Sequence, residues 1–231
     1  MRGQQYRSAI RSVVATFGDG AQDFIFLGSC VLGLYRRPSG GTFRQTIDAD
    51  VVSTVTPWSK QQKRLADMCT RGVLDPDERI TCRYHIRGEN IAVDVLSPEG
   101  KNVGNITPWF LRSIAHPETF ALEDGVRVRA VAPPYFLALK LEAWADRGED
   151  PMTDKDAEDI VAVATEVLDL AESVHRQGIR EGIRDLWEDA LENHDLNIGD
   201  IPEIVRCHHH PIDAAEEDRV VETLTRCARG A

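Results

Sequence analysis

The sequence predicts an α+β protein: a small mixed sheet flanked by helices over residues 1–130, and a bundle of helices over residues 131–231. Two observations carry this prediction. In the first part, short apolar runs of strand length alternate with turn residues, whereas from Pro133 onward the pattern is helical. At 231 residues, of which 42% are hydrophobic, the chain is long enough for a core domain with a helical extension.

The elements expected in the first part are helices, single strands and hairpins. An amphipathic helix comes first and ends at Gly18-Asp19-Gly20, and a later helix begins at Pro57-Trp58 with Ser59 as its cap. Turn chemistry typical of hairpins is present at Gly88-Glu89-Asn90 and around Asp124-Gly125. In chain order the expected elements are helix 4–17, strand 23–27, a helix starting at 30–34, strand 46–52, helix 57–71, strands 79–87 and 90–96, and a hairpin over 120–128.

The second part is expected to consist of helices joined by short connections. No internal repeat or low-complexity segment interrupts it, and Trp144 and Trp187 are interpreted as residues that pack between helices. The boundary with the first part is expected near residue 130. The expected helices span 133–147, 154–171, 173–193 and 213–228.

The strongest functional signal is a turn after one strand followed by two aspartates on the next. The first apolar run stops at Gly28-Ser29, where glycine allows a sharp turn and the amides of the following helix face an incoming phosphate. Asp48 and Asp50 are at positions i and i+2 of a strand, so both carboxylates point to one face and can share divalent metal. The residues expected to pack behind them are Ile47, Ala49 and Val51.

Asp94 is expected to supply a third carboxylate. It interrupts the otherwise apolar strand Ile91-Ala92-Val93-Asp94-Val95-Leu96. A buried ionised carboxylate is costly unless it is paired or ligates a metal, so Asp94 requires a cation. The alternative is a residue of an edge strand that faces water.

In these features the sequence resembles the polymerase-β-like nucleotidyltransferases, whose signature is Gly-Ser followed by Asp-x-Asp on the next strand. Within that superfamily it is most similar to the toxin nucleotidyltransferases of the AbiEii and MenT types. The intervening loop departs from the pattern, because Arg36–Gly41 is basic and rich in glycine. Three patterns within residues 24–165 carry the resemblance: Gly28-Ser29 with Arg44-x-Thr46-x-Asp48-x-Asp50, Pro134–Ala143 with Arg147, and Lys155–Ile160.

The resemblance implies a metal-dependent site that binds a nucleoside triphosphate. Asp48, Asp50 and Asp94 would hold Mg²⁺ or Mn²⁺ and, with Lys140 and Asp156, would be the catalytic residues. Lys140 matches a functional lysine of the toxin families, and Asp156 matches the aspartate of their Lys-Asp motif. The residues implied to bind the nucleotide are Gly28, Ser29, Arg44, Thr46 and Arg147.

Helical spacing gives a separate argument for the residues of the second part. Lys140 and Arg147 are seven positions apart, about two turns, so they lie on one helix face and could together hold a triphosphate. Asp156 and Asp159 likewise share a face. The alternatives are a surface lysine paired with an acid such as Glu142, and ordinary aspartate capping near a helix N-terminus.

Charge is divided unevenly along a chain whose net charge is -11. Residues 1–87 contain 13 Lys and Arg against 8 Asp and Glu, whereas residues 88–231 contain 14 against 30. The basic front part would attract a substrate that carries phosphate, and the acidic remainder would repel it or face a protein. Since no long apolar run and no signal-like segment is present, a cytoplasmic protein without a membrane partner is expected.

The cysteines are expected to be free, buried thiols, because none of the five forms a CxxC pair. The segment Cys207-His208-His209-His210 superficially suggests zinc. Consecutive residues cannot all ligate one ion without strain, and no second cluster has ligand spacing, so no zinc site is expected. The role of this segment is left open.

The predicted reaction is transfer of a nucleoside monophosphate from an NTP to an acceptor hydroxyl, with release of pyrophosphate. The resemblance implies that the acceptor is the 3′ end of RNA, in particular tRNA, and that the enzyme is the toxin of a toxin–antitoxin system with an antitoxin protein as partner. A small-molecule nucleotidyltransferase of the antibiotic-modifying kind is an alternative, which the acidic back half favours. A catalytically inactive nucleotide-binding or interaction module is another, against which the three aspartates argue.

Overall fold

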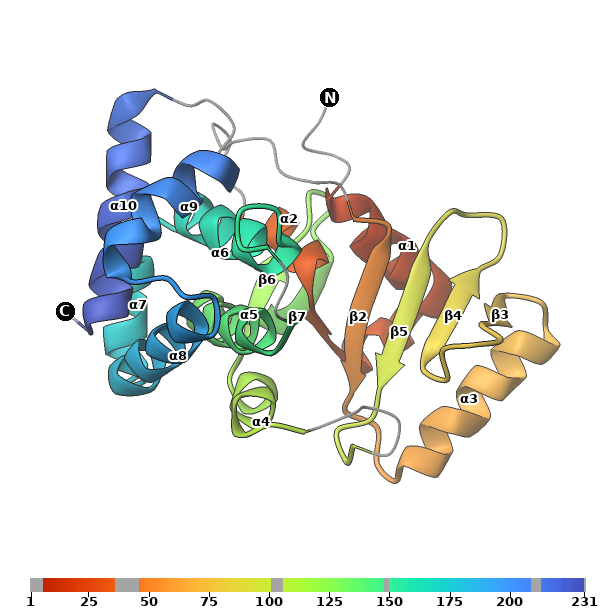
Figure 1. The fold of residues 1–231 in the computed structure, drawn as a ribbon. Coiled ribbons are helices and arrows are strands. Elements are labelled where there is room, and N and C mark those ends of the chain that lie inside the picture. The colour runs from red at the N-terminus through yellow and green to blue at the C-terminus, as the bar shows by residue number, and fades with distance from the viewer. Residues whose placement is uncertain (1–5, 36–45, 101–105, 148–149, 209–212, 231) are drawn as a thin grey trace. The chain divides into compact units, whose positions relative to one another are not determined.

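The computed structural model describes residues 6–35, 46–100, 106–147, 150–208 and 213–230. By their internal contacts the described residues form two compact units, the first within 1–34 and 44–132 and the second within 35–43 and 133–231. The predicted α+β class is confirmed, with a seven-stranded mixed sheet in the first unit and helices in the second (Figure 1). In the described residues, no helix combines the length and apolar character needed to cross a bilayer.

The sheet of the first unit has the strand order β3-β4-β5-β2-β1-β7-β6. Its inner strand β1, Phe24–Leu27, pairs antiparallel with β2 and parallel with β7, while β2 pairs parallel with β5. All four residues of β1 are buried, which explains the unbroken apolar run in the sequence. The other strands are β2 (Asp48–Ser53), β3 (Leu74–Pro76), β4 (Arg83–Ile86), β5 (Ala92–Leu96), β6 (Pro117–Ala121) and β7 (Arg127–Val131).

Helices flank this sheet. Helix α1, Tyr6–Phe17, packs against β2 and β4 through the fully buried side chains of Ala9, Ile10 and Val13 (Figure 1). Both predicted hairpins form, since β4 pairs antiparallel with β5 and β6 with β7. The other helices up to residue 132 are η2 (Gly18–Asp23), η3 (Ser29–Val31), α2 (Leu32–Tyr35), α3 (Trp58–Thr70) and α4 (Pro108–Ala115), of which η2 and η3 are 3₁₀ helices.

Some local predictions for this unit are wrong. Helix α1 ends at Phe17 as predicted, but the 3₁₀ helix η2 that follows it from Gly18 was not predicted. Ser59 is not a cap: α3 begins one residue earlier, and the extended Pro57 is its N-cap residue without a side-chain bond. β3, at three residues, is too short to leave a periodic signal. Helix α4 was not predicted, although Thr107 caps it by accepting a hydrogen bond from the Phe110 amide at 3.1 Å.

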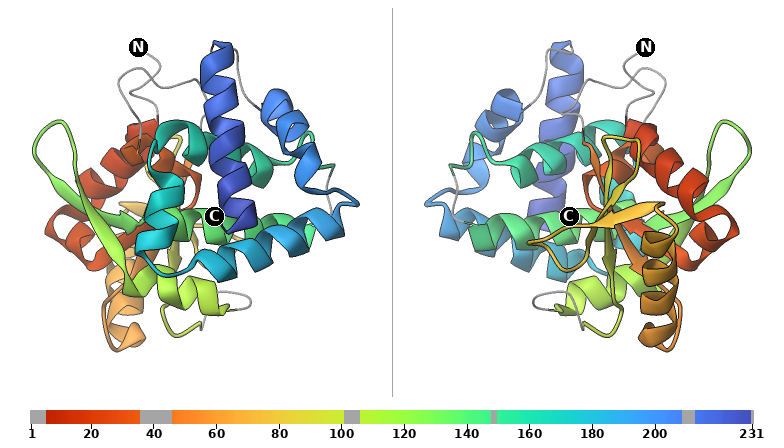
Figure 2. Two further views of the ribbon diagram at one scale, coloured as in Figure 1. Left: turned by 90° about the vertical axis from the view of Figure 1, so that its left-hand side faces the viewer. Right: turned by 90° about the vertical axis from the view of Figure 1, so that its right-hand side faces the viewer.

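The second unit is helical, and α5 spans Pro133–Arg147 as predicted. The two long helices predicted over 154–171 and 173–193 are in fact three, because α6 ends at Glu166 and a break at Gly178, with φ +65°, separates α7 from α8. Helix α10, dark blue in Figure 2, packs against α6, α7, α8 and α9. The remaining helices are α6 (Lys155–Glu166), α7 (Leu170–Arg176), α8 (Arg180–Asn193), η4 (Ile198–Asp200), α9 (Ile201–His208) and α10 (Ala214–Arg229).

Aromatic packing between α5 and α8 forms the centre of the second unit. The rings of Trp144 and Trp187 meet edge to face at 6.0 Å, and neither side chain is more than 1% exposed. His194 stacks on Trp144 at 4.9 Å. The interpretation of both tryptophans as packing residues is therefore confirmed.

Candidate active site

Strand β2 presents Asp48 and Asp50 on one face of the sheet, as the i and i+2 spacing predicts. Behind them Ala49 and Val51 are fully buried, but Ile47 is 45% exposed. The prediction that Ile47 packs in the core is wrong, because β2 begins only at Asp48 and the residue before it lies outside the sheet.

Gly28 lies directly against Asp50. Its backbone has φ +63° and ψ -173°, a conformation that is essentially restricted to glycine. A Cβ atom at this position would lie 1.9 Å from Oδ2 of Asp50. The glycine after β1 is thus required twice, by the turn and by the carboxylate that occupies the space of a side chain.

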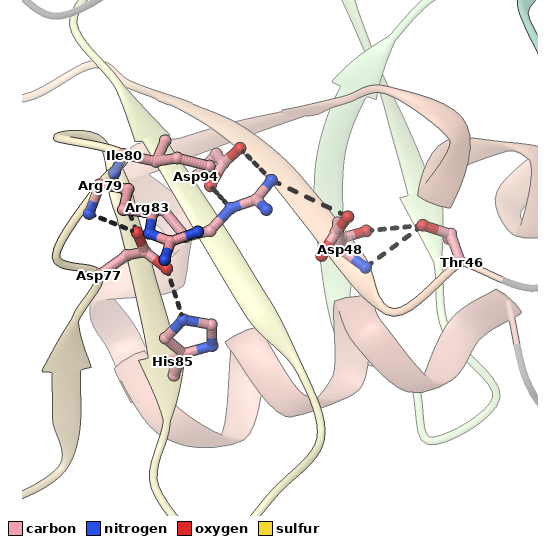
Figure 3. A network of polar contacts seen from close by, with 8 residues as sticks. All are labelled: Thr46, Asp48, Asp77, Arg79, Ile80, Arg83, His85 and Asp94. Atoms are coloured by element: carbon pink, nitrogen blue, oxygen red, sulfur yellow. Dashed lines mark hydrogen bonds and ion pairs between the residues drawn. The ribbon is translucent and has the colours of Figure 1, made fainter.

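Asp94 completes the group of carboxylates, since β5 pairs in register with β2 and places Asp94 beside Asp50. The cation that contacts Asp94 is a protein side chain. Arg83 on β4 donates from Nε to Oδ1 at 2.8 Å and from Nη2 to Oδ2 at 2.9 Å, so both carboxylate oxygens are engaged (Figure 3). The same Nη2 atom lies 3.9 Å from Oδ2 of Asp48. Hydrogen bonding to Asp94 raises the pKa of Arg83 further above its ordinary value.

A tight turn before β4 holds Arg83 in this position (Figure 3). Oδ1 of Asp77 accepts the backbone amides of Arg79 and Ile80 at 2.8 and 2.9 Å, and the Asp77 amide donates to the Arg83 carbonyl at 2.9 Å. Oδ2 of Asp77 lies 3.0 Å from Nε2 of His85. The hydrogen bond to His85 and those from the two amides lower the pKa of Asp77 to about 2. This turn also explains why the strand expected over 79–87 begins only at Arg83.

Thr46 and Ser29, both expected to bind the nucleotide, occupy different settings. The Thr46 hydroxyl donates to the Asp48 carbonyl at 3.1 Å and accepts the Asp48 amide at 3.2 Å, so it fixes the start of β2. Ser29 begins η3 directly after Gly28. Their roles toward a nucleotide stay predictions. Arg44 lies outside the described residues, as do Arg36 and Arg37.

The donor chemistry of Asp48, Asp50 and Asp94 fits a divalent cation, because three carboxylates on one sheet face are the hard oxygen ligands that Mg²⁺ and Mn²⁺ prefer. In the described part of the chain no group of three or more Asp, Glu, His or Cys is placed as a set of metal ligands. An ion that binds Asp94 must compete with Arg83 for its oxygens.

The second unit brings together the other predicted residues, Lys140, Arg147 and Asp156. Nζ of Lys140 lies 2.9 Å from Oδ1 of Asp156 and 2.6 Å from Oδ2 of Asp159. Nη1 of Arg147 lies 2.6 Å from Oδ2 of Asp156. The two predicted shared faces are therefore present, and they face each other: the cations of α5 meet the carboxylates of α6.

Asp156 is fully buried, and the Lys140 side chain is only 14% exposed. Burial opposes the charged form of Lys140, but the nearby carboxylates of Asp159 and Asp156 outweigh it, and the pKa of Lys140 is raised. The charged lysine stabilises the fold below its ordinary pKa of 10.5, and this contribution is lost as pH rises through the higher folded value. Lys140 is thus not a surface residue, but it does pair with acids, as the alternative supposed, and a role for Lys140 in catalysis stays a prediction.

Asp154 is the N-cap of α6 and accepts the amides of Asp156 and Ala157 at 2.6 and 3.1 Å. The capping role that was the alternative for Asp156 therefore belongs to Asp154. The cysteines are free, as expected, although Cys207 is exposed. Nε2 of His208 lies 2.8 Å from the Pro151 carbonyl, and His209 and His210 lie outside the described residues.

Comparison with known proteins supports the fold. No family model matches the chain, and no curated protein matches its sequence. A similar solved structure is the crystal structure of an antigenic nucleotidyltransferase-like protein from Paracoccidioides brasiliensis. The two are 16% identical, with a TM-score of 0.52 over 79% of this chain and 93% of the other. At this identity the match shows a shared nucleotidyltransferase-like fold, and membership of the AbiEii or MenT family stays a prediction.

Replacement of Gly28 by alanine tests the contact with Asp50. We expect Gly28→Ala to lower the free energy of unfolding by about 1–3 kcal/mol, because the backbone is strained for any other residue, and to weaken Mn²⁺ binding because the Asp50 carboxylate is displaced. Urea unfolding and calorimetric titration with Mn²⁺ measure both. Gly125→Ala is the control, since Gly125 has φ +82° but nothing within 4 Å of an added Cβ. Equal Mn²⁺ binding by the two variants would contradict the assignment.

Removal of Lys140 tests the ion-pair network of the second unit. We expect Lys140→Met to lower the free energy of unfolding by about 3–5 kcal/mol, because it removes the buried cation that pairs with both Asp156 and Asp159 and leaves Arg147 as the partner of Asp156. The triple variant that combines Lys140→Met with Asp156→Asn and Asp159→Asn should regain most of the lost free energy of unfolding. Urea unfolding compares these variants with Lys155→Met, which removes an exposed lysine from the start of α6. If Lys140→Met and Lys155→Met unfold at the same urea concentration, the network does not stabilise the unit.

Proposed function

We propose that this protein is a metal-dependent nucleotidyltransferase that transfers a nucleoside monophosphate from an NTP to an acceptor hydroxyl and releases pyrophosphate. One observation carries the proposal: on a nucleotidyltransferase-like fold, β2 presents Asp48 and Asp50 beside the glycine turn after β1, and β5 places Asp94 in register with Asp50. Three carboxylates gathered on one face offer the hard oxygen ligands that Mg²⁺ and Mn²⁺ prefer, so the arrangement favours a site for metal and phosphate.

In the proposed reaction Asp48, Asp50 and Asp94 hold Mg²⁺ or Mn²⁺. Bound there, the metal lowers the pKa of the attacking hydroxyl and neutralises charge on the phosphates. The backbone amides that follow the Gly28 turn and the Ser29 hydroxyl are proposed to bind phosphate. Arg83 neutralises Asp94 while metal is absent and gives up a carboxylate oxygen when metal binds.

Lys140, Arg147 and Asp156 have a less direct part in the proposal. Their mutual ion pairs fix the charged ends of both cations on one side of α5. Fixed cations are suited to stabilise the negative charge that develops on a triphosphate, because they need no reorganisation when the reaction occurs. Arg44 and Thr46 are proposed as further nucleotide contacts on the resemblance alone.

The proposed acceptor is the 3′ end of RNA, in particular tRNA, and the proposed biological role is that of a toxin whose partner is an antitoxin protein. The excess of basic residues in the first 87 positions supports an RNA acceptor. The excess of acidic residues after position 87 supports a second candidate, a small-molecule nucleotidyltransferase that acts on a cationic antibiotic.

Label transfer separates these candidates. The protein is incubated with each α-labelled NTP, Mg²⁺ or Mn²⁺, and either total RNA or an aminoglycoside. Label in RNA of tRNA length supports the first candidate, and label in the aminoglycoside supports the second. No transfer to either acceptor with any NTP would overturn both and would favour the inactive nucleotide-binding or interaction module.

Removal of a single β2 carboxylate should abolish transfer while the fold persists. We expect Asp48→Asn and Asp50→Asn each to lower transfer by more than about 100-fold, since loss of residues that merely support metal ligands already costs about 10 to 100-fold. Circular dichroism and urea unfolding verify that the variants fold. Transfer at the wild-type rate by either variant would exclude the metal site.

Arg83→Gln tests the competition between the guanidinium and metal. Without metal, we expect a loss of about 1.5–3 kcal/mol in the free energy of unfolding, because Asp94 loses two charge-assisted hydrogen bonds. The affinity for Mn²⁺, measured by calorimetry, should increase because the competitor is removed. Arg87→Gln, which breaks an exposed pair with Asp75, serves as the control. Weaker Mn²⁺ binding by Arg83→Gln than by Arg87→Gln would show that Arg83 assists the metal instead.

A further inference from the structure

A polar hollow is present in the first unit, between the end of α1 and helix α3. Its volume is about 480 Å³, and α1 contributes the wall from Ala15 to Phe17. On the α3 side the wall contains four cationic side chains and one carboxylate: Lys60, Lys63, Arg64, Arg71 and Asp67. Helix α3 follows the C-terminal end of β2, whereas Asp48 is the first residue of β2 (Figure 1). The hollow is therefore separate from the three carboxylates.

The cations of α3 form a row along the helix. Lys60, Arg64 and Arg71 are at positions i, i+4 and i+11 and so lie on one face, and the row from Lys60 to Arg71 is about 16 Å long at 1.5 Å per residue. Within the described residues, Lys60, Lys63 and Arg71 form no ion pair with a carboxylate. Lys60, Lys63 and Arg71 therefore present unpaired positive charge along the helix, which in a chain of net charge -11 fits an anion whose charges are spread along its length.

Arg64 stabilises this wall through contacts with the end of α1 and the residues that follow it. Its Nη2 donates to the Phe17 carbonyl at 3.1 Å, and its Nη1 lies 3.4 Å from both the Gly20 carbonyl and Oδ2 of Asp23. Its guanidinium also lies over the Phe17 ring at 5.6 Å. Arg64 therefore joins α3 to the end of α1 and shapes the hollow, while Lys60, Lys63 and Arg71 are the cations that can bind a ligand.

A smaller hollow of about 220 Å³ shares Lys60 and Arg64 in its wall. Gln61 also lines it, is fully buried, and has no hydrogen-bond partner for either Nε2 or Oε1. A buried amide with two unsatisfied atoms costs stability unless an occupant pairs with it. The occupant it fits has a group that both donates and accepts hydrogen bonds, next to a negative charge.

We propose that the α3 groove, in which Lys60, Lys63 and Arg71 line the larger hollow and Lys60 and Gln61 line the smaller one, binds the phosphodiester backbone of RNA. The row of cations pairs with successive phosphates, and Gln61 pairs with a ribose 2′-hydroxyl, which is both a donor and an acceptor and is absent from DNA. A single phosphate or a free nucleotide is too short to engage the whole row. The inference rests on the proposed RNA acceptor and assigns the contact with a part of it remote from the reacting 3′ end.

The test compares two faces of one helix. Lys60→Gln with Arg71→Gln removes two positive charges from the groove, and Gln62→Glu with Ala66→Glu changes the net charge equally on exposed positions of α3 outside the groove. Fluorescence anisotropy measures binding of labelled tRNA between 50 and 300 mM KCl. We expect the groove variant to bind about tenfold or more weakly at low salt, with a salt slope smaller by about 1.4, because each contact with a single-stranded phosphate contributes about 0.7. Mn²⁺ binding should stay at the wild-type level.

Gln61→Leu supplies a second, independent readout. It removes the unpaired amide, so the protein should be at least as stable as the wild type in urea, while the preference for an RNA oligonucleotide over DNA of the same sequence should fall. Equal tRNA affinity in the groove and control variants would overturn the inference. Binding of poly-glutamate by the wild-type protein as tightly as it binds tRNA, in the same buffer, would overturn it as well. A loss of tRNA binding confined to the groove variant, with no label transfer by the wild type, would keep the groove and reject the proposed function. Normal label transfer with unchanged binding would reject the groove alone.

Discussion

The sheet of the first unit holds two carboxylates of like charge next to each other, and its stability depends on how that repulsion is offset. The parallel pairing of β2 with β5 sets Asp50 beside Asp94, and two carboxylates at neighbouring positions of a sheet destabilise it unless a cation intervenes. Arg83 supplies that cation with a two-pronged hydrogen bond from the next strand. The sheet can therefore form without a metal ion, because the guanidinium holds the carboxylates in position.

In the second unit the buried charge is a cation, and carboxylates offset it. Lys140 is a cation in a helical interior, and Asp156 and Asp159 of the next helix make its charge tolerable there. In each unit, then, a residue predicted from the sequence to be functional forms an ion pair with a side chain of opposite charge. Such pairing fixes the direction of a charged group at the cost of its freedom, which suits a group that must be in place before a substrate binds.

The sequence was sufficient for the features that depend on local pattern. The i and i+2 spacing of Asp48 and Asp50, the apolar run of β1 and the span of α5 were all predicted, because each follows from periodicity within one element. Arg83 was missed because its role depends on the register between two strands. A turn centred on Glu89 would pair Asp94 with Tyr84, whereas the structure pairs it with Arg83, and a shift of one residue exchanges the two faces of a strand. Ion pairs between helices, such as Lys140 with Asp159, are likewise invisible until the helices are packed.

That register gives the β4–β5 turn a constraint that surface turns seldom have. Exposed connections ordinarily tolerate insertion and deletion. Here one added or deleted residue near Gly88 would slip β4 along β5, bring Cys82 or Tyr84 opposite Asp94, and turn Arg83 to the other side of the sheet. The length of this short loop, more than its composition, therefore decides whether the carboxylates retain their guanidinium.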